Sequence, residues 1–132
     1  MELKPNLLFS FFFSIFLIAT TCASVSGILV HTFNQLGNGK VLNVHCTLDL
    51  STDMGAHDIP DSGSYEWSFS QEGENGSLLE CDASTKGAAN VLHFAGYLKS
   101  RDACTSNCDW RFTDKGVFRL VDGQWRFHFS WP

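Results

Sequence analysis

The sequence predicts an all-β protein, an antiparallel β-sandwich of about eight strands with two disulfides. Apolar and polar residues alternate with a period of two in several segments, which is typical of strands with one buried face. Turn sequences rich in glycine, asparagine and aspartate separate these segments. No long window after the apolar amino terminus carries the apolar stripe of an amphipathic helix, so helical folds are disfavoured.

The first residues of the chain are expected to be an export signal rather than folded structure. The segment 7–19 is apolar and rich in phenylalanine, and it is too short to span a bilayer. Small residues precede Ser24 at the positions that signal peptidases require. We therefore expect a signal peptide over residues 1–23, with the cut placed within 23–27, and one domain over residues 24–132. The mature protein should be secreted and extracellular, without stable membrane insertion.

The amino-terminal half of this domain is expected to contribute four strands. The segment 28–34 is a weak candidate, and a Gly-Asn-Gly turn at 37–39 separates it from the clear alternation of 42–48. In 64–70 aromatic residues alternate with serine and glutamate, and in 79–83 leucine, cysteine and alanine alternate with acids. Each of these segments is predicted to bury one face in the core.

The carboxyl-terminal half is expected to contribute four more strands. The segments 91–97 and 117–121 are weak candidates, whereas 108–113 alternates cysteine, tryptophan and phenylalanine with polar residues. The clearest alternation is that of 124–131, whose four aromatic residues are expected to fill the core. These four are Trp125, Phe127, Phe129 and Trp131. Asp122-Gly123 should form a two-residue hairpin loop between the last two strands.

Four cysteines follow the leader, and export places them in an oxidising compartment where thiols pair. Four cysteines allow three pairings. Cys104 and Cys108 are close enough in sequence to close a local loop, which leaves Cys46 and Cys81 for each other. A four-cysteine zinc site is the alternative, but the paired spacing that it favours is absent around Cys46 and Cys81. We predict two disulfides, with Cys46 and Cys81 both pointing into the core, and no metal or other cofactor.

Asn75-Gly76-Ser77 is the only N-glycosylation acceptor sequence in the chain. It falls in a predicted exposed turn of a protein that is expected to enter the secretory route. Asn75 is therefore a candidate glycosylation site.

Charge is distributed unevenly along a chain whose net charge is −5. An acidic domain is not expected to bind nucleic acid. Nine acids and no basic residue lie between Lys40 and Lys86, and the basic residues gather after this stretch. Two interpretations are open: solvated outer faces and loops, or an acidic surface that steers association with a basic partner.

No clustered catalytic constellation is apparent. The chain has neither a His-Glu-x-x-His run nor a Gly-x-Ser-x-Gly elbow. Its histidines lie on separate predicted elements; they are His31, His45, His57, His93 and His128. His45 and His128 are the candidates for acid–base hydrolysis of RNA. We expect no enzymatic activity, with a secreted defence or hydrolytic protein acting on RNA or a microbial surface as the alternative.

An ordered set of short motifs covers nearly the whole domain. They are Leu29-Val30-His31 with Asn34 and Leu36, Val44-His45-Cys46, Asp53-Met54-Gly55-Ala56-His57, Tyr65-Glu66-Trp67-Ser68-Phe69, Cys81, Arg101-Asp102, Cys104, Cys108-Asp109-Trp110 and Asp114-Lys115-Gly116-Val117-Phe118. This set resembles the plant self-incompatibility protein homologues, a family of small secreted plant proteins. Each motif is weak alone, and the set is specific because the motifs occur in the order of the family.

The resemblance implies a β-sandwich with two disulfides and a secreted protein without known enzymatic activity. It also implies a ligand that a cell-surface receptor protein recognises, in cell–cell recognition or in the rejection of self pollen. Specificity should then reside in loops held by the rigid scaffold. Turn chemistry places the expected contact loops at Ser51–Gly63, Glu72–Ser77, Ser84–Asn90 and Lys99–Asn107.

Overall fold

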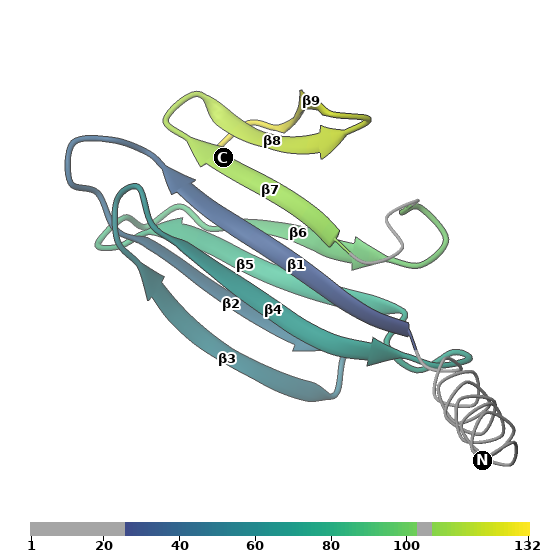
Figure 1. Ribbon diagram of the computed structural model, residues 1–132. Coiled ribbons are helices and arrows are strands. Elements are labelled where there is room, and N and C mark those ends of the chain that lie inside the picture. Colours follow the sequence, from purple (N-terminus) through teal and green to yellow (C-terminus); the bar gives the residue numbers. More distant parts are fainter. Residues whose placement is uncertain (1–25, 103–106) are drawn as a thin grey trace, which may run out of the picture.

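The computed structural model describes residues 26–102 and 107–132 and places nine strands there in two packed sheets (Figure 1). The strands are β1 (Ser26–Gln35), β2 (Leu42–Leu48), β3 (Thr52–Ile59), β4 (Ser64–Gln71), β5 (Leu78–Thr85), β6 (Leu92–Leu98), β7 (Asn107–Thr113), β8 (Gly116–Val121) and β9 (Gln124–Phe129). The predicted all-β fold is confirmed. The signal peptide predicted over residues 1–23 lies outside the described residues.

The two sheets hold five and four strands. The five-stranded sheet has the order β4-β1-β7-β8-β9, and the four-stranded sheet has the order β3-β2-β5-β6. Neighbouring strands are antiparallel in every described pair but one, because β1 and β7 run parallel. The antiparallel prediction is wrong for this pair. Parallel neighbours need a long connection between them, and here the whole chain from β2 to β6 lies between β1 and β7.

The core lies between the inner faces of the two sheets. Its largest fully buried side chains are Trp67, Trp110 and Phe112, and the Trp110 indole Nε1 donates a hydrogen bond of 2.9 Å to the Gly96 carbonyl. Cys46 and Cys81 are buried and form a disulfide between directly paired residues of β2 and β5. The predicted pairing and inward direction of these two cysteines are confirmed.

The strand β3 was not predicted, because the segment Ser51–Gly63 was expected to be a contact loop. Thr52–Ile59 instead forms the edge strand of the four-stranded sheet, beside β2. Only Ile59 of this strand is fully buried, and a register shift interrupts its pairing with β2. An edge strand with one core residue and a bulge has no regular alternation, so its sequence resembles a loop.

The prediction that all four aromatic residues of the last strand fill the core is also wrong. One extra residue in β9 shifts the register between Val117 and Phe118, so that Phe118 pairs with Phe127 and Val117 pairs with Phe129. Phe127 is 55% exposed, whereas Phe129 and Trp131 pack against the core. A bulge moves the residues that follow it to the other face of a strand.

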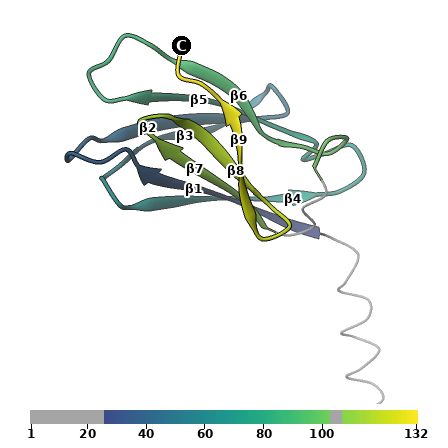
Figure 2. The ribbon, with the colours of Figure 1, turned by 90° about the horizontal axis from the view of Figure 1, so that it is seen from above.

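The chain after this bulge crosses from the five-stranded sheet towards β6 (Figure 2). The Trp131 indole Nε1 donates a hydrogen bond of 2.7 Å to the Thr113 carbonyl, and the Asn90 amide donates one of 2.9 Å to the Pro132 carbonyl. The carboxyl-terminal segment therefore covers one open side of the sandwich.

The predicted hairpin between β8 and β9 is confirmed. Asp122 and Gly123 have φ values of 51° and 77°, and these two residues join the paired strands. Within residues 26–102 and 107–132, no helix is long and apolar enough to cross a membrane.

Candidate functional site

Three connections meet at one end of the sandwich, which we call the loop end. They are the β2–β3 turn at Asp49–Ser51, the β4–β5 loop at Glu72–Ser77 and the start of the β6–β7 connection at Lys99–Asp102 (Figure 1). The Lys99 amide donates a hydrogen bond of 2.9 Å to the Ser77 carbonyl, and its ammonium group donates one of 2.8 Å to the Gly73 carbonyl. Two of the predicted contact loops, Glu72–Ser77 and Lys99–Asn107, are thus brought together in their described parts.

The Asp49 carboxylate organises the loop end. It accepts hydrogen bonds from the backbone N–H groups of Gly76, Ser77 and Leu78, at 2.8, 3.0 and 3.2 Å. The hydrogen bond from Gly76 is the main reason why the pKa of Asp49 is lowered from its ordinary value. A Cβ atom on Gly76 would lie 2.2 Å from the Ser70 carbonyl oxygen, so no larger residue fits there. These contacts therefore fix the conformation of the β4–β5 loop.

Replacing Asp49 by asparagine is expected to loosen the β4–β5 loop without unfolding the sandwich. The neutral amide oxygen is a weaker acceptor for three N–H groups, so we expect a loss of about 1–2 kcal/mol in the free energy of unfolding. Hydrogen exchange at Gly76, Ser77 and Leu78 should become faster, while exchange in β1 and β7 stays unchanged. Equal acceleration throughout the described strands would contradict this local role.

A cavity of about 410 Å³ opens beside this loop. Its lining residues come from the β4–β5 and β6–β7 connections and are Glu74, Ser77, Leu98, Lys99 and Ser100. The Lys99 ammonium group lies 3.7 Å from the Glu74 carboxylate, so the lining combines both charges with an apolar side chain. Such a lining suits the recognition of a mixed polar and apolar surface.

The β6–β7 connection is anchored by the buried carboxylate of Asp102. The Arg101 guanidinium donates hydrogen bonds of 2.8 and 2.9 Å to its two oxygens, and the Leu98 amide donates one of 2.7 Å. Arg119 forms a second ion pair with the same carboxylate. Both arginines lie over the ring of Trp110, with guanidinium carbons 5.7 and 5.5 Å from its centroid. Although burial opposes ionisation, these donors lower the pKa of Asp102.

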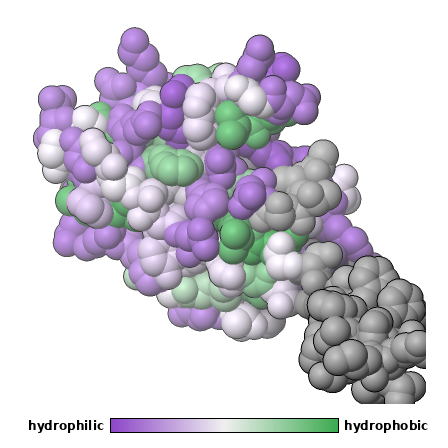
Figure 3. All heavy atoms as spheres, viewed as in Figure 1, coloured by the Kyte–Doolittle hydropathy of each residue, from purple (hydrophilic) through white to green (hydrophobic). Residues whose placement is uncertain are grey.

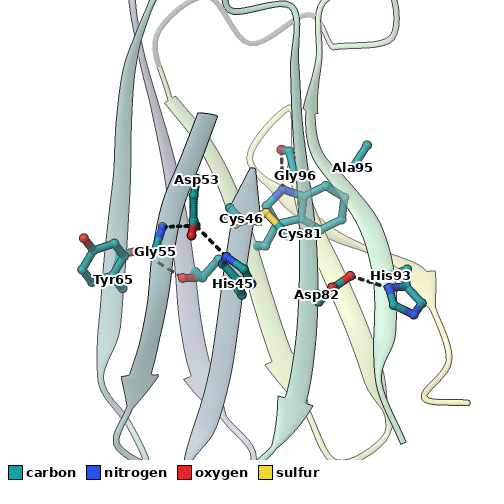
Figure 4. Close-up of a disulfide and its surroundings, with 12 residues drawn as sticks. His45, Cys46, Asp53, Gly55, Tyr65, Cys81, Asp82, His93, Ala95 and Gly96 are labelled. Carbon is teal, nitrogen blue, oxygen red and sulfur yellow. Dashed lines mark hydrogen bonds and ion pairs between the residues drawn. A yellow bond between two sulfur atoms is a disulfide. The ribbon is translucent and has the colours of Figure 1, made fainter. Parts of the chain in front are cut away.

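The outer face of the four-stranded sheet carries two histidine–aspartate pairs (Figure 4). His45 Nε2 lies 2.6 Å from the Asp53 carboxylate, and His93 pairs with Asp82. A cavity of about 270 Å³ lies on this face, lined by His45, Thr47, Leu50, Glu80 and Asp82. This face therefore gathers several of the acids from the stretch between Lys40 and Lys86.

The proposed acid–base pair of His45 and His128 is not assembled as one site. His45 lies on β2 in the four-stranded sheet, and His128 lies on β9 in the five-stranded sheet, edge to face with Trp110. Burial, followed by the nearby guanidinium groups of Arg119 and Arg101, lowers the pKa of His128. Among the described residues, no group of three histidine, cysteine, aspartate or glutamate side chains could hold a metal ion.

His31 lies between two acids on the outer face of the five-stranded sheet. Its Nδ1 lies 2.7 Å from the Asp109 carboxylate of β7, and its Nε2 lies 2.6 Å from the Glu66 carboxylate of β4. Burial of the ring opposes protonation, but the hydrogen bonds to Asp109 and Glu66 outweigh it and raise the pKa of His31. A protonated His31 thus connects three neighbouring strands.

This ion cluster predicts a pH-dependent contribution to stability. Because the pKa of His31 is higher in the folded state, its contribution is complete below the ordinary value of 6.5 and is lost as the pH rises through the folded pKa. At pH 5, His31→Gln should lower the free energy of unfolding by about 1 kcal/mol, and at pH 9 the difference should vanish. Urea unfolding at both pH values measures it. A difference that grows with pH would contradict this assignment.

The other predicted site residues lie apart from one another. Cys108 of β7 is disulfide-bonded, but Cys104 lies outside the described residues, so the Cys104–Cys108 bridge stays a prediction. Asn75 is exposed in the β4–β5 loop, at the loop end. The predicted contact loop Ser84–Asn90 lies at the opposite end, where the Lys86 amide donates a hydrogen bond of 2.8 Å to the Val41 carbonyl.

These observations define a small disulfide-bonded β-sandwich with a rigid, organised loop end. The plant self-incompatibility protein S1 family matches residues 29–131, which is most of the chain. The chain belongs to this family and is a plant self-incompatibility-related protein. Neither a search of curated proteins nor one of solved structures gives a match.

Proposed function

We propose that this protein is a secreted ligand that a receptor at a plant cell surface recognises. The match to the self-incompatibility S1 family over residues 29–131 is the observation that carries the proposal. The geometry of the loop end supports it, because hydrogen bonds to Asp49 and the buried Asp102 fix the shape of two loops that face solvent. A preorganised loop surface loses little conformational entropy when a partner binds. Roles in cell–cell recognition or self-pollen rejection fall within this proposal.

Exchange of loops tests where the receptor binds. The full chain, exported from a eukaryotic host and labelled with a fluorophore, is added to intact plant cells with and without excess unlabelled protein. We expect saturable binding that is lost when Glu72–Ser77 and Lys99–Asn107 are replaced by the loops of another family member. Exchange of Ser84–Asn90 is the matched comparison, because this loop is also expected from sequence to be a contact loop but lies at the opposite end. Preserved binding after this exchange would confine the contact surface to the loop end. Binding that survives both loop-end exchanges would overturn the contact surface, and absence of saturable binding would overturn the ligand function.

Processing follows from the same proposal. Passage through the secretory route should remove residues 1–23, with an end point within 23–27, and should add a glycan at Asn75. Asn75 supports this because it is exposed, and its backbone exchanges hydrogen bonds of 2.9 Å with Glu72 in a tight turn. The mass of the exported protein, measured before and after glycosidase and reduction, reports the cut, the glycan and the thiols together. An uncut chain of full mass would contradict export.

A defence or hydrolytic role on RNA or a microbial surface is the alternative. The positions of His45 and His128 in different sheets give it no support, and neither does the S1 family, which is not known for enzymes. The purified protein, assayed on RNA with His45→Ala and His128→Ala as variants, tests it. If the native protein hydrolyses RNA and either variant does not, the hydrolytic role would replace the ligand proposal.

A further inference from the structure

The outer face of the five-stranded sheet carries a cluster of aromatic side chains around one arginine, which we call the aromatic–arginine patch. It comprises Phe33 of β1, Arg111 of β7, Phe118 of β8, and Trp125 and Phe127 of β9. The register places Arg111 between Phe33 of β1 and Phe118 of β8. Its chain neighbours Trp110 and Phe112 point to the other face of β7, into the core. Figure 3 presents this side of the molecule, where hydrophobic side chains lie among hydrophilic ones.

Among the described residues, the Arg111 guanidinium contacts aromatic rings and pairs with no carboxylate. Its central carbon lies 5.0 Å from the ring centroid of Phe118 and 4.9 Å from that of Trp125. Its Nε is buried and has no hydrogen-bond partner among the described residues. By contrast, Arg101 and Arg119 both pair with Asp102. In a chain with a net charge of −5, Arg111 is thus a cation without a carboxylate in the part of the chain that the structure describes.

This arrangement is preorganised for an anionic group. The rings fix the guanidinium in place through cation–π contacts, and its planar donors match the two oxygens of a carboxylate. Phe127 is 55% exposed beside it, so apolar area surrounds the charge. Tryptophan and arginine at the centre of an apolar patch are the residue types that contribute most energy to protein–protein interfaces.

We propose that the aromatic–arginine patch docks an extracellular protein partner that presents a carboxylate between apolar side chains. The proposal rests on the proposed ligand function and adds to the loop end a second surface, with a stated partner chemistry. The charge of Arg111 is complementary to such a carboxylate, and the desolvation of the surrounding rings would strengthen the pair.

Two features favour a protein over an acidic polysaccharide. The rings meet edge to face, with interplanar angles of 81° for Phe33 and Trp125 and 76° for Phe118 and Phe127, so they form no flat platform for sugar rings. The same face also carries Asp109, two residues before Arg111 on β7, and Glu66 on β4, and both would repel a polyanion lying across the sheet. A single carboxylate placed at Arg111 meets less of this repulsion than a chain of carboxylates.

Nuclear magnetic resonance of the full chain, exported from an isotope-labelled yeast culture, tests the proposal. The probe is a short synthetic peptide with one aspartate between leucines, and the control peptide carries asparagine instead. We expect saturable shifts of the Arg111 Nε and Trp125 indole signals with the aspartate peptide and binding at least about 30-fold weaker with the asparagine peptide. Arg111→Gln and Phe127→Ala should each abolish the shifts. Arg126→Gln removes the same charge from the opposite face of β9 and should leave them intact.

The outcomes separate this proposal from the ligand function. Equal binding of both peptides, unchanged binding by Arg111→Gln, or preferential binding of a uronic acid oligosaccharide would each overturn the proposed partner chemistry. A dimer in solution that Arg111→Gln dissociates would assign the patch to a second copy instead, and would also overturn it. If saturable binding to plant cells is normal in Arg111→Gln, the docking surface fails while the ligand function stands. If cell binding is absent but the peptide shifts occur, the docking surface stands while the ligand function fails.

Discussion

Replacing Cys46 and Cys81 together by alanine is expected to lower the free energy of unfolding by about 4 kcal/mol. The bridge closes a loop with a sequence separation of 35, so its loss returns much conformational freedom to the unfolded chain. Both sulfur atoms lie in the buried centre of the four-stranded sheet, where alanine also leaves unfilled volume. A loss of this size is a large share of the stability of a small domain.

Urea unfolding followed by tryptophan fluorescence measures this loss. Cys104→Ala with Cys108→Ala is the matched control, because the predicted ring between them is short and its loss should cost only about 2 kcal/mol. An equal or larger effect of the control pair would contradict the view that the Cys46–Cys81 bridge is the main covalent support of the core.

Replacing Asp102 by asparagine should destabilise the protein by about 3 kcal/mol or more at neutral pH. The Asp102 side chain is fully buried, and two guanidinium groups share its charge, one of them on the nearly buried Arg119. The variant keeps the shape of the side chain but leaves these buried positive charges without the carboxylate that they face. Removing one member of a buried ion pair costs more than the pair contributes, because the remaining charge stays desolvated.

The pH dependence identifies the cause of this loss. Because the pKa of Asp102 is lower in the folded protein than its ordinary value of 3.8, its contribution is complete above that value and falls as the pH drops through the folded pKa. The difference in the free energy of unfolding between the native protein and Asp102→Asn should therefore be largest at pH 7 and should decrease on strong acidification. Asp114→Asn, at an exposed turn, is the control and should change stability little. A difference in unfolding free energy that does not depend on pH would mean that lost packing, and not lost charge, causes the destabilisation.

Much of the fold could be predicted because buried strands have a strong period-two signal. Central strands such as β2, β5 and β7 bury alternate residues, and their predicted ranges agree closely with the observed ones. The pairing of Cys46 with Cys81 also followed from sequence, because four cysteines allow few combinations. The edge strand β3 lacked this signal, since only Ile59 is fully buried there.

The functional surfaces were much less predictable. The contacts of His31 with Glu66 and Asp109 join three strands that are far apart in the chain. No local pattern marks such a cluster, because it depends on the register between neighbouring strands. The aromatic–arginine patch was hidden for a related reason: Trp125 and Phe127 were expected in the core until the bulge in β9 turned them outward.

The sequence alone was sufficient to predict an all-β domain, most of its strands, one disulfide and the family resemblance. The strands and the motifs of the family depend on residues close together in the chain, and four cysteines allow only three pairings. The order of strands, the parallel pairing of β1 with β7 and the surroundings of Asp102 and Arg111 were decided only when the two sheets packed. The physical reason is that hydrophobic burial prescribes which face of a strand is hidden, whereas neighbours, register and charge partners follow from how distant strands meet.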